Sequence, residues 1–324
     1  MGDPCRVATI TDVDYISNLV GERLMAKGLL GSPITLQKFA QDAQDHPDSK
    51  LVYLNKGRHG IVVTVSPARF PEVVAEECLK AAQMRSRLGD LGAPILEPLD
   101  TGRIEASSYA VLPYRRPFSR RRGTKWLHRI WVKRHLLEWL LQVTQRGSAA
   151  CGLSRYQASL QALRATVAAD SPTAALLGTA ENRLRSGRFV PRSAPMHGDL
   201  WKGNVLHGVA STAFTLVDWR GSETQGFPIF DLVRAAGSFG LSARALHREL
   251  QLHRAALGCH MEDLPVYAVG ALGHYAARLG QMSPALFRTM ADECADRLMS
   301  ALEAPDLSAS MRIFIGGRGR HAAT

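Results

Sequence analysis

The amino-acid sequence predicts an α+β fold, in which a small N-terminal part with an antiparallel sheet precedes a larger, mainly helical part. Short runs rich in Val, Leu and Ile, bounded by turn residues, concentrate in the first 113 residues. Amphipathic segments of helical length follow from residue 126 onward, interrupted by two short apolar runs. At 324 residues, the chain is long enough for two lobes, each with its own core.

In the N-terminal part, apolar spacing and turn residues indicate two helices and four strands. Thr11 is a candidate N-cap for the first helix, and a Lys-Gly-Arg-His-Gly turn joins two strands into a hairpin. We place the boundary after Pro113, so the two lobes are residues 1–113 and 114–324. The predicted elements are helices over residues 12–25 and 72–88, and strands over residues 34–39, 50–55, 61–66 and 109–113.

The second part is predicted to be helical, with two strands too short for helices. The tail from about residue 316 is rich in Gly, Arg and His, which is typical of disorder. The expected helices cover residues 126–145, 154–168, 172–184, 228–238, 243–256, 262–279 and 284–302, and the strands residues 204–207 and 214–217.

The composition is that of a globular protein, with 46% hydrophobic and 21% charged residues. No apolar run reaches the roughly 18 residues of a membrane-spanning helix, and the N-terminus does not predict a signal peptide. The five cysteines are scattered and form no Cys-x-x-Cys pair. We therefore expect reduced thiols and a cytoplasmic location.

The net charge of +11 is concentrated in one segment. Residues 115–134, from Arg115 to Arg134, hold nine Arg or Lys and no acid, which leaves +2 for the rest of the chain. Three interpretations apply: a solvated loop leading into a helix, a peripheral contact with an anionic membrane surface, or nucleic-acid binding. The absence of a recognised nucleic-acid motif makes the third the weakest, and the second would fit a lipid-linked substrate.

The chemistry concentrates between His197 and Asp218. The segment Met-His-Gly-Asp-Leu-Trp-Lys-Gly-Asn-Val-Leu holds Asp199 and Asn204 five residues apart, and a second short strand ends at Asp218. Phosphoryl transfer from ATP needs one carboxylate to orient the attacking hydroxyl and oxygen ligands to hold magnesium. Asp199 suits the first role, and Asn204 and Asp218 suit the second.

These motifs resemble the aminoglycoside phosphotransferase and choline kinase family, within the bilobal protein-kinase-like fold. The resemblance covers about residues 34–302 and includes a Phe-Asp-Leu sequence at Asp231. It implies that Asp199 is the catalytic base and that Asn204 and Asp218 bind Mg²⁺. It also implies that His197 braces the loop and that Asp231 holds it from a helix. An isolated Asp-x-x-x-x-Asn would more often be structural, so the hypothesis rests on the whole set.

The match is weaker in the first lobe. In this fold, a lysine on the third strand normally holds the α- and β-phosphates and pairs with a helix glutamate, and that strand position is Thr64 here. The partner acid would be Glu76 or Glu77. Three other cations could bind the phosphates in place of that lysine: Lys56, Arg58 and Arg69. We prefer Arg69, because it closely follows the strand. A nucleotide-binding pseudokinase with a regulatory or scaffold role is the alternative.

Two further nucleotide contacts are expected from the resemblance. Residues 41–48 occupy the position of the glycine-rich phosphate loop but contain no glycine. Leu112 and Tyr114, on either side of Pro113, resemble the hinge whose backbone bonds the adenine edge.

The acceptor is expected to be a small-molecule alcohol that is neutral or anionic, such as a sugar-containing compound or a glycolipid. Polycationic aminoglycosides require acid-lined sites, whereas residues 243–302 contain only two adjacent acidic pairs, Glu262–Asp263 and Asp292–Glu293. An antibiotic-modifying phosphotransferase is a further alternative. The sequence does not determine the oligomeric state or the choice between ATP and GTP.

Overall fold

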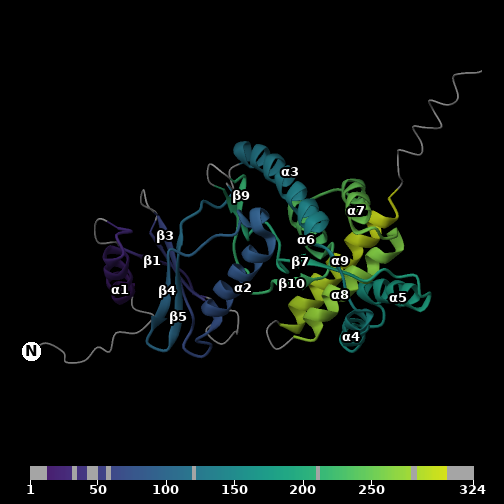
Figure 1. Ribbon diagram of the computed structural model, residues 1–324, viewed down its shortest axis with the longest axis horizontal. Helices are drawn as coiled ribbons and strands as arrows, with labels where there is room; N and C mark the ends of the chain where they lie inside the picture. Colours follow the sequence, from purple (N-terminus) through teal and green to yellow (C-terminus); the bar gives the residue numbers. More distant parts are fainter. Residues whose placement is uncertain are drawn as a thin grey trace, which may run out of the picture.

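The computed structural model describes residues 13–30, 35–41, 50–55, 60–118, 122–208, 212–278 and 283–304. Figure 1 shows two lobes, a sheet-bearing one at the left and a helical one at the right. This arrangement confirms the predicted bilobal α+β fold. The structure describes only Gln41 of the predicted phosphate loop at residues 41–48. The rest of that loop lies outside the described residues, as do Lys56, Arg58 and the tail from residue 316.

The first lobe is built on a five-stranded antiparallel sheet with the strand order β1-β2-β3-β5-β4. All four predicted strands are present, and β4 was not expected from the sequence. The strands are β1 (Gln37–Gln41), β2 (Leu51–Asn55), β3 (Ile61–Val65), β4 (Asp100–Ile104) and β5 (Ser107–Pro113), and the helices are α1 (Val13–Ala26), α2 (Val73–Leu88) and the short η1 (Gly89–Gly92).

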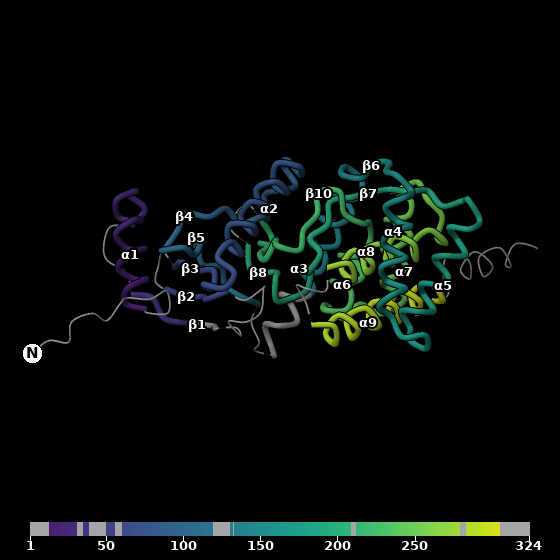
Figure 2. Tube along the Cα trace, turned by 90° about the horizontal axis from the view of Figure 1, so that it is seen from below, coloured from purple at the N-terminus to yellow at the C-terminus, as the bar shows by residue number. Residues whose placement is uncertain are grey.

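The two faces of the sheet pack against different partners. Strand alternation places Ile61, Val63 and Val65 on one face, where they join the buried side chains of α1 in a separate small core. The opposite face carries Thr64, paired with Val52 on β2 and with Ala110 on β5, and it faces α2 and the second lobe. Figures 1 and 2 both show α2 between the sheet and the helical lobe, with α1 at the far end.

The second lobe consists of helices packed around one large core, with two small sheets at the side that faces α2. One sheet has the order β10-β7-β6, and β8 pairs with β9 as a hairpin. The elements are α3 (Arg122–Gly147), β6 (Ala149–Ala150), α4 (Leu153–Arg164), α5 (Pro172–Arg185), β7 (Arg192–Met196), β8 (Val205–His207), β9 (Phe214–Leu216), β10 (Glu223–Gly226), α6 (Phe230–Phe239), α7 (Ala243–Leu257), η2 (Met261–Asp263), α8 (Leu264–Ala276) and α9 (Pro284–Leu302).

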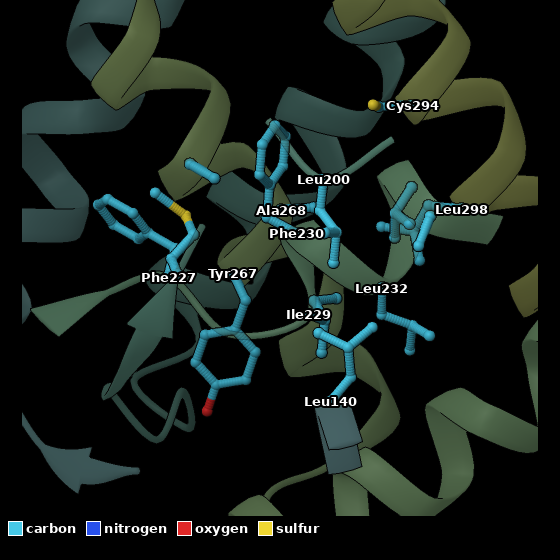
Figure 3. Close-up of a cluster of buried hydrophobic side chains, with 14 of the residues drawn as sticks. Leu140, Leu200, Phe227, Ile229, Phe230, Leu232, Tyr267, Ala268, Cys294 and Leu298 are labelled. Atoms are coloured by element: carbon cyan, nitrogen blue, oxygen red, sulfur yellow. The ribbon is translucent and has the colours of Figure 1, made fainter. Parts of the chain in front are cut away.

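The core of this lobe fixes the segments that carry the predicted chemistry. Leu200, in the loop after β7, is fully buried beside Phe230 of α6, as Figure 3 shows, and Leu232 of the same helix belongs to the same core. Burial of these three side chains ties the loop to α6. Across the described residues, no helix is both long and apolar enough to span a membrane.

Candidate active site

The loop of residues 197–204 is anchored by a buried carboxylate on α6. Asp231 accepts hydrogen bonds from the backbone amides of His197 (2.6 Å) and Gly198 (2.9 Å), one at each oxygen. Gly198 has φ +88°, and a Cβ there would lie 2.5 Å from the carbonyl oxygen of Gly221, so glycine is required. Burial raises the pKa of Asp231, while the hydrogen bonds from the two backbone amides oppose that rise. The carboxylate thus holds the strained start of the loop.

The His197 ring connects this loop to the segment after β9. Its Nε2 lies 3.0 Å from the carbonyl oxygen of Val217, and its Nδ1 accepts from the amide of Asp199 at 3.3 Å. Both contacts are satisfied by one neutral tautomer with the proton on Nε2. The ring is 2% exposed and packs on Trp219 at a centroid distance of 4.4 Å. His197 therefore holds Asp199 and the Asp218 segment in one arrangement.

Asp199 is held by groups on both of its oxygens. The Nδ2 of Asn204 donates to Oδ2 at 3.0 Å and also to the backbone oxygen of Asp199 at 2.9 Å. The Nη2 of Arg234, on α6, donates to Oδ1 at 2.9 Å. The Asp199 side chain remains 45% exposed, so it is oriented and still accessible to a ligand. Arg234 was not among the residues expected from the sequence.

Asn204 and Asp218 are brought together by the β8–β9 hairpin. The amide of Val217 donates to the carbonyl oxygen of Asn204 at 3.1 Å, so Asp218 follows directly after this backbone bond. Asp218 adopts φ +67°, which is uncommon for a residue with a side chain. Unusual backbone geometry of this kind is frequent at functional sites.

Lys50 is the cation that the structure places at this site. Its Nζ lies 2.8 Å from Oδ1 of Asp218 and 2.5 Å from Oε2 of Glu77 on α2. Burial opposes the charged form of Lys50, but the carboxylates of Glu77 and Asp218 outweigh burial and raise its pKa. Burial likewise opposes ionisation of Asp218, whose pKa is nevertheless lowered, chiefly by Lys50. Both groups are therefore charged at neutral pH.

The strand register explains why Lys50 reaches this position. Lys50 immediately precedes β2, and Leu51 pairs with Val65 while Val52 pairs with Thr64. Because side chains alternate along a strand, Lys50 and Val52 share the sheet face that carries Thr64. A cation from the neighbouring strand thus enters beside the position expected to hold the lysine. The sequence signal was available, since the predicted hairpin begins at Lys50.

The other residues expected to bind the nucleotide divide into some that lie near Lys50 and some that contact other groups. Arg69 stacks on Phe70, with its Cζ 5.6 Å from the ring centroid. Glu76 lies 3.5 Å from Arg220, whereas Glu77 is the acid beside Lys50. Thr64 and Leu112 line a small pocket of about 30 Å³, and Glu77 and Asp218 line the same pocket. The backbone amide of Tyr114 donates to the carbonyl oxygen of Gly60 at 2.7 Å.

The donor set fits magnesium better than a transition metal. Among the described residues, no cluster of three His, Cys, Asp or Glu side chains forms a self-sufficient metal site. Asn204 and Asp218 offer an amide oxygen and a carboxylate. Mg²⁺ is commonly held by one or two such protein ligands together with substrate phosphates, so the arrangement suits an ion that arrives with a nucleotide.

Solved structures with the same fold include several phosphotransferases. A thermostable mutant of an aminoglycoside phosphotransferase, solved with ADP and hygromycin B, aligns with a TM-score of 0.53 at 13% identity, covering 89% of this chain and 99% of that one. A choline kinase from Streptococcus pneumoniae aligns with a TM-score of 0.51 at 11% identity, covering 88% and 99%. A macrolide 2'-phosphotransferase from Brachybacterium faecium gives 0.51 at 17% identity, covering 91% and 99%. At these identities, the likeness establishes the fold alone.

Comparisons of the sequence with known proteins and with family models identify the family. No curated protein sequence matches the chain at a significant level. A family model described as "Phosphotransferase enzyme family" matches residues 47–286, which include Lys50, Glu77, Asp199, Asn204 and Asp218. The predicted family is thereby confirmed, and the chain belongs to the phosphotransferase enzyme family.

Proposed function

We propose that this protein is an ATP- and Mg²⁺-dependent small-molecule kinase that transfers the γ-phosphoryl group to an alcohol. The observation that carries the proposal is the convergence of Lys50, Glu77 and Asp218 at one point, with Asp199 and Asn204 joined to it through His197 and the β8–β9 hairpin. Phosphoryl transfer requires this combination of a phosphate-binding cation, oxygen ligands for a metal and a carboxylate for the hydroxyl.

The groups of the site divide the proposed reaction between them, and Asn204 contributes both to positioning the base and to holding the metal. Asp199 orients the acceptor hydroxyl and takes its proton as the oxygen attacks the γ-phosphorus and the bond to the ADP oxygen breaks. Arg234 and Asn204 fix the direction of the Asp199 carboxylate. Asn204 and Asp218 would hold Mg²⁺, which would neutralise charge on the phosphates.

Lys50 is proposed as the ligand of the α- and β-phosphates. The Lys50 side chain is 15% exposed, and its ammonium already lies between two carboxylates. When a nucleotide and Mg²⁺ engage Asp218, the contact between Lys50 and Asp218 is expected to be replaced by one with phosphate oxygens, while Glu77 keeps the ammonium in place. Leu112 and Tyr114 remain the proposed adenine contacts; because the Tyr114 amide is bonded to Gly60, that amide would have to change partner to serve as one.

The acceptor is proposed to be a neutral or anionic sugar-containing compound. The neighbouring structures include proteins named for an aminoglycoside, for choline and for a macrolide, so the fold alone selects none of these classes. The basic segment from Arg115 to Arg134 falls partly outside the described residues, and its described part exposes Ile130 and Trp131 on α3. Peripheral attachment to an anionic membrane surface stays a prediction, for which vesicle sedimentation with and without anionic lipid is the test.

The experiment for the main proposal is a nucleotide-binding and turnover assay. Thermal unfolding is followed with ATP, GTP and ADP, each with and without Mg²⁺, and a panel of alcohols is then screened for ADP release. We expect Mg²⁺-dependent stabilisation by nucleotide and ADP release with at least one acceptor. Nucleotide binding without turnover across a broad panel would favour the pseudokinase, whereas turnover limited to polycationic antibiotics would favour the antibiotic-modifying alternative.

A further inference from the structure

A hollow of about 550 Å³ lies between the 197–204 loop, α6 and α9. Trp201 and Lys202 line it from the loop, Arg234 from α6, and Glu293 and Arg297 from α9. Its volume is in the range of small-molecule sites. Because Arg234 also bonds Asp199 at 2.9 Å, the hollow begins beside the proposed base.

The cations of this hollow outnumber its acids. Arg234 is balanced by Asp199, but neither Lys202 nor Arg297 has an ion-pair partner within 4.0 Å among the residues that the structure describes. Glu293 is the one acid among the described residues that line it. Lys202 and Arg297 therefore form no ion pair within the described part of the chain, and Glu293 is the acid that shares the hollow with them.

Arg297 is held in this hollow by its packing against α6. A Cβ at Gly237 would lie 2.9 Å from Nε and 3.2 Å from Cζ of Arg297, so the guanidinium rests directly on the glycine. A guanidinium fixed in this way presents its remaining donors to a ligand with little loss of side-chain entropy.

The other acids of this region are engaged elsewhere. Asp263 is buried and paired with Arg183 at 2.6 Å, and Asp292 accepts from the hydroxyl of Thr173 at 2.5 Å. An adjacent hollow of about 320 Å³ shares Glu293 and Arg297 and adds Asp296, but neither Lys202 nor Arg234 lines it. Glu293 and Arg297 therefore line both hollows, whereas Asp296 lines only the adjacent one and Lys202 and Arg234 line only the hollow beside Asp199.

Trp201 adds an apolar surface to the same space. Its indole lies over Gly203, where a Cβ would overlap the ring, and the residue as a whole is 41% exposed. A partly exposed indole offers a face for the C–H groups of a sugar or polyol ring. The hollow therefore combines an aromatic platform with the cations Lys202 and Arg297, and Arg234 connects it to the carboxylate of Asp199.

We propose that this hollow binds an acceptor alcohol that carries an oxyanion, such as a phosphate or a carboxylate, which Lys202 and Arg297 hold while the hydroxyl reaches Asp199. The inference rests on the proposed kinase function and narrows its acceptor class from neutral or anionic to anionic. A polycationic acceptor would meet the two uncompensated cations and be repelled.

The test measures binding of four matched probes by calorimetry to protein saturated with ADP and Mg²⁺: glucose, glucose 6-phosphate, glucuronate and glucosamine. The two anionic probes distinguish phosphate from carboxylate. We expect at least one of them to bind about ten-fold or more tightly than glucose, with glucosamine weakest. Arg297→Gln should remove this preference. Arg288→Gln, which removes an exposed arginine of α9 outside the hollow, should retain it.

Three results would overturn the inference: equal affinities for all four probes, no measurable binding of either anionic probe, or a preference that survives in both Arg297→Gln and Lys202→Met. Loss of ADP affinity in Arg297→Gln would also overturn it, because the guanidinium would then belong to the nucleotide site. A wild-type protein that fails to bind ADP and Mg²⁺ would instead refute the proposed function, and that titration is performed first.

Discussion

Lys50 contacts Glu77 from the start of β2, the strand beside the one on which this fold normally carries its lysine. The two strands are adjacent and antiparallel, and the register places Lys50 and Thr64 on the same face. The distance from Nζ of Lys50 to Oδ1 of Asp218 is 2.8 Å, so the ammonium is shared between α2 and the segment after β9. An ammonium on a long, flexible stem can approach one point from either strand.

The first prediction concerns this relocated lysine. Lys50→Met should lower kcat/KM for ATP by about 100-fold or more, because it removes the cation proposed to hold the phosphates. The double variant Lys50→Met with Thr64→Lys should recover part of that loss, since it returns an ammonium to the same face of the sheet. Steady-state kinetics with varied ATP, combined with nucleotide titration, measure both effects.

The rescue separates a phosphate-binding role from a structural one. If Lys50 only neutralised Glu77 and Asp218, Lys50→Met would lower the free energy of unfolding without a matching change in nucleotide affinity. Chemical denaturation of all three proteins provides that control. Recovery of stability in the double variant, with no recovery of ATP affinity, would contradict the assignment.

The sequence predicted the α-helices better than the strands. Helix periodicity identified the segments that became α3 to α9, because long amphipathic helices carry strong signals. The strands β4, β6, β7 and β10 were missed. β4 contains Asp, Thr, Gly and Arg, and β6 has two residues, so neither shows the alternation that marks a strand. β6, β7 and β10 depend on pairing partners distant in the chain, whereas β4 forms a hairpin with the neighbouring β5.

In the candidate site, local motifs identified some residues, whereas others are brought in only by the folding of distant parts of the chain. The local motifs around Asp199 and Asp218 were readable because their spacing is set by one loop and one hairpin. Lys50 was missed because the expected position, Thr64, was sought along a single strand, whereas the cation comes from the neighbouring one. Arg234 was missed because its contact with Asp199 joins residues 35 positions apart, and no local pattern encodes that packing.

A second prediction separates the roles of Asp199 and Asp218. Asp199→Ala should reduce transfer by about 10²- to 10⁴-fold, the usual contribution of a general base, with nucleotide affinity nearly unchanged. Asp218→Ala should instead weaken Mg²⁺-dependent nucleotide binding itself. Titration of Mg²⁺ at fixed ADP, alongside single-turnover transfer rates, checks both. The assignment is wrong if Asp199→Ala loses Mg²⁺-dependent binding while Asp218→Ala retains it.

A third prediction treats Arg234 as the residue that positions Asp199. Arg234→Ala should lower kcat by about ten-fold or more, the effect of losing one charge-assisted hydrogen bond, while ADP affinity stays unchanged. Because Arg234 lines the hollow, added guanidinium ion at low, non-denaturing concentration has access to the vacated position. Partial recovery of kcat by guanidinium, and not by sodium at equal ionic strength, would support the positioning role. Equal responses to the two salts would refute it.

The last prediction concerns the pH dependence of stability beneath the active site. His253 on α7 is 1% exposed, its Nδ1 lies 2.9 Å from Oγ1 of Thr144, and its buried Nε2 has no hydrogen-bond partner. Burial lowers the pKa of His253 to about 4. Asp231 lines the same small cavity, but its carboxylate accepts from two backbone amides of the 197–204 loop.

Whether stability rises or falls with pH depends on whether His253 binds its proton more strongly in the folded or in the unfolded state. In the unfolded chain, His253 has an ordinary pKa of about 6.5, so between about pH 6.5 and pH 4 the unfolded state binds more protons than the folded state. The contribution of His253 to the free energy of unfolding is fully present above that window, and about 3 kcal/mol of it is lost as the pH falls through the window. Urea denaturation of the wild type and of His253→Gln at pH 7 and pH 4.5 isolates this contribution, because other groups titrate in both proteins. The wild type should lose more stability than the variant over this interval, and equal losses would show that the folded protein accommodates a protonated His253.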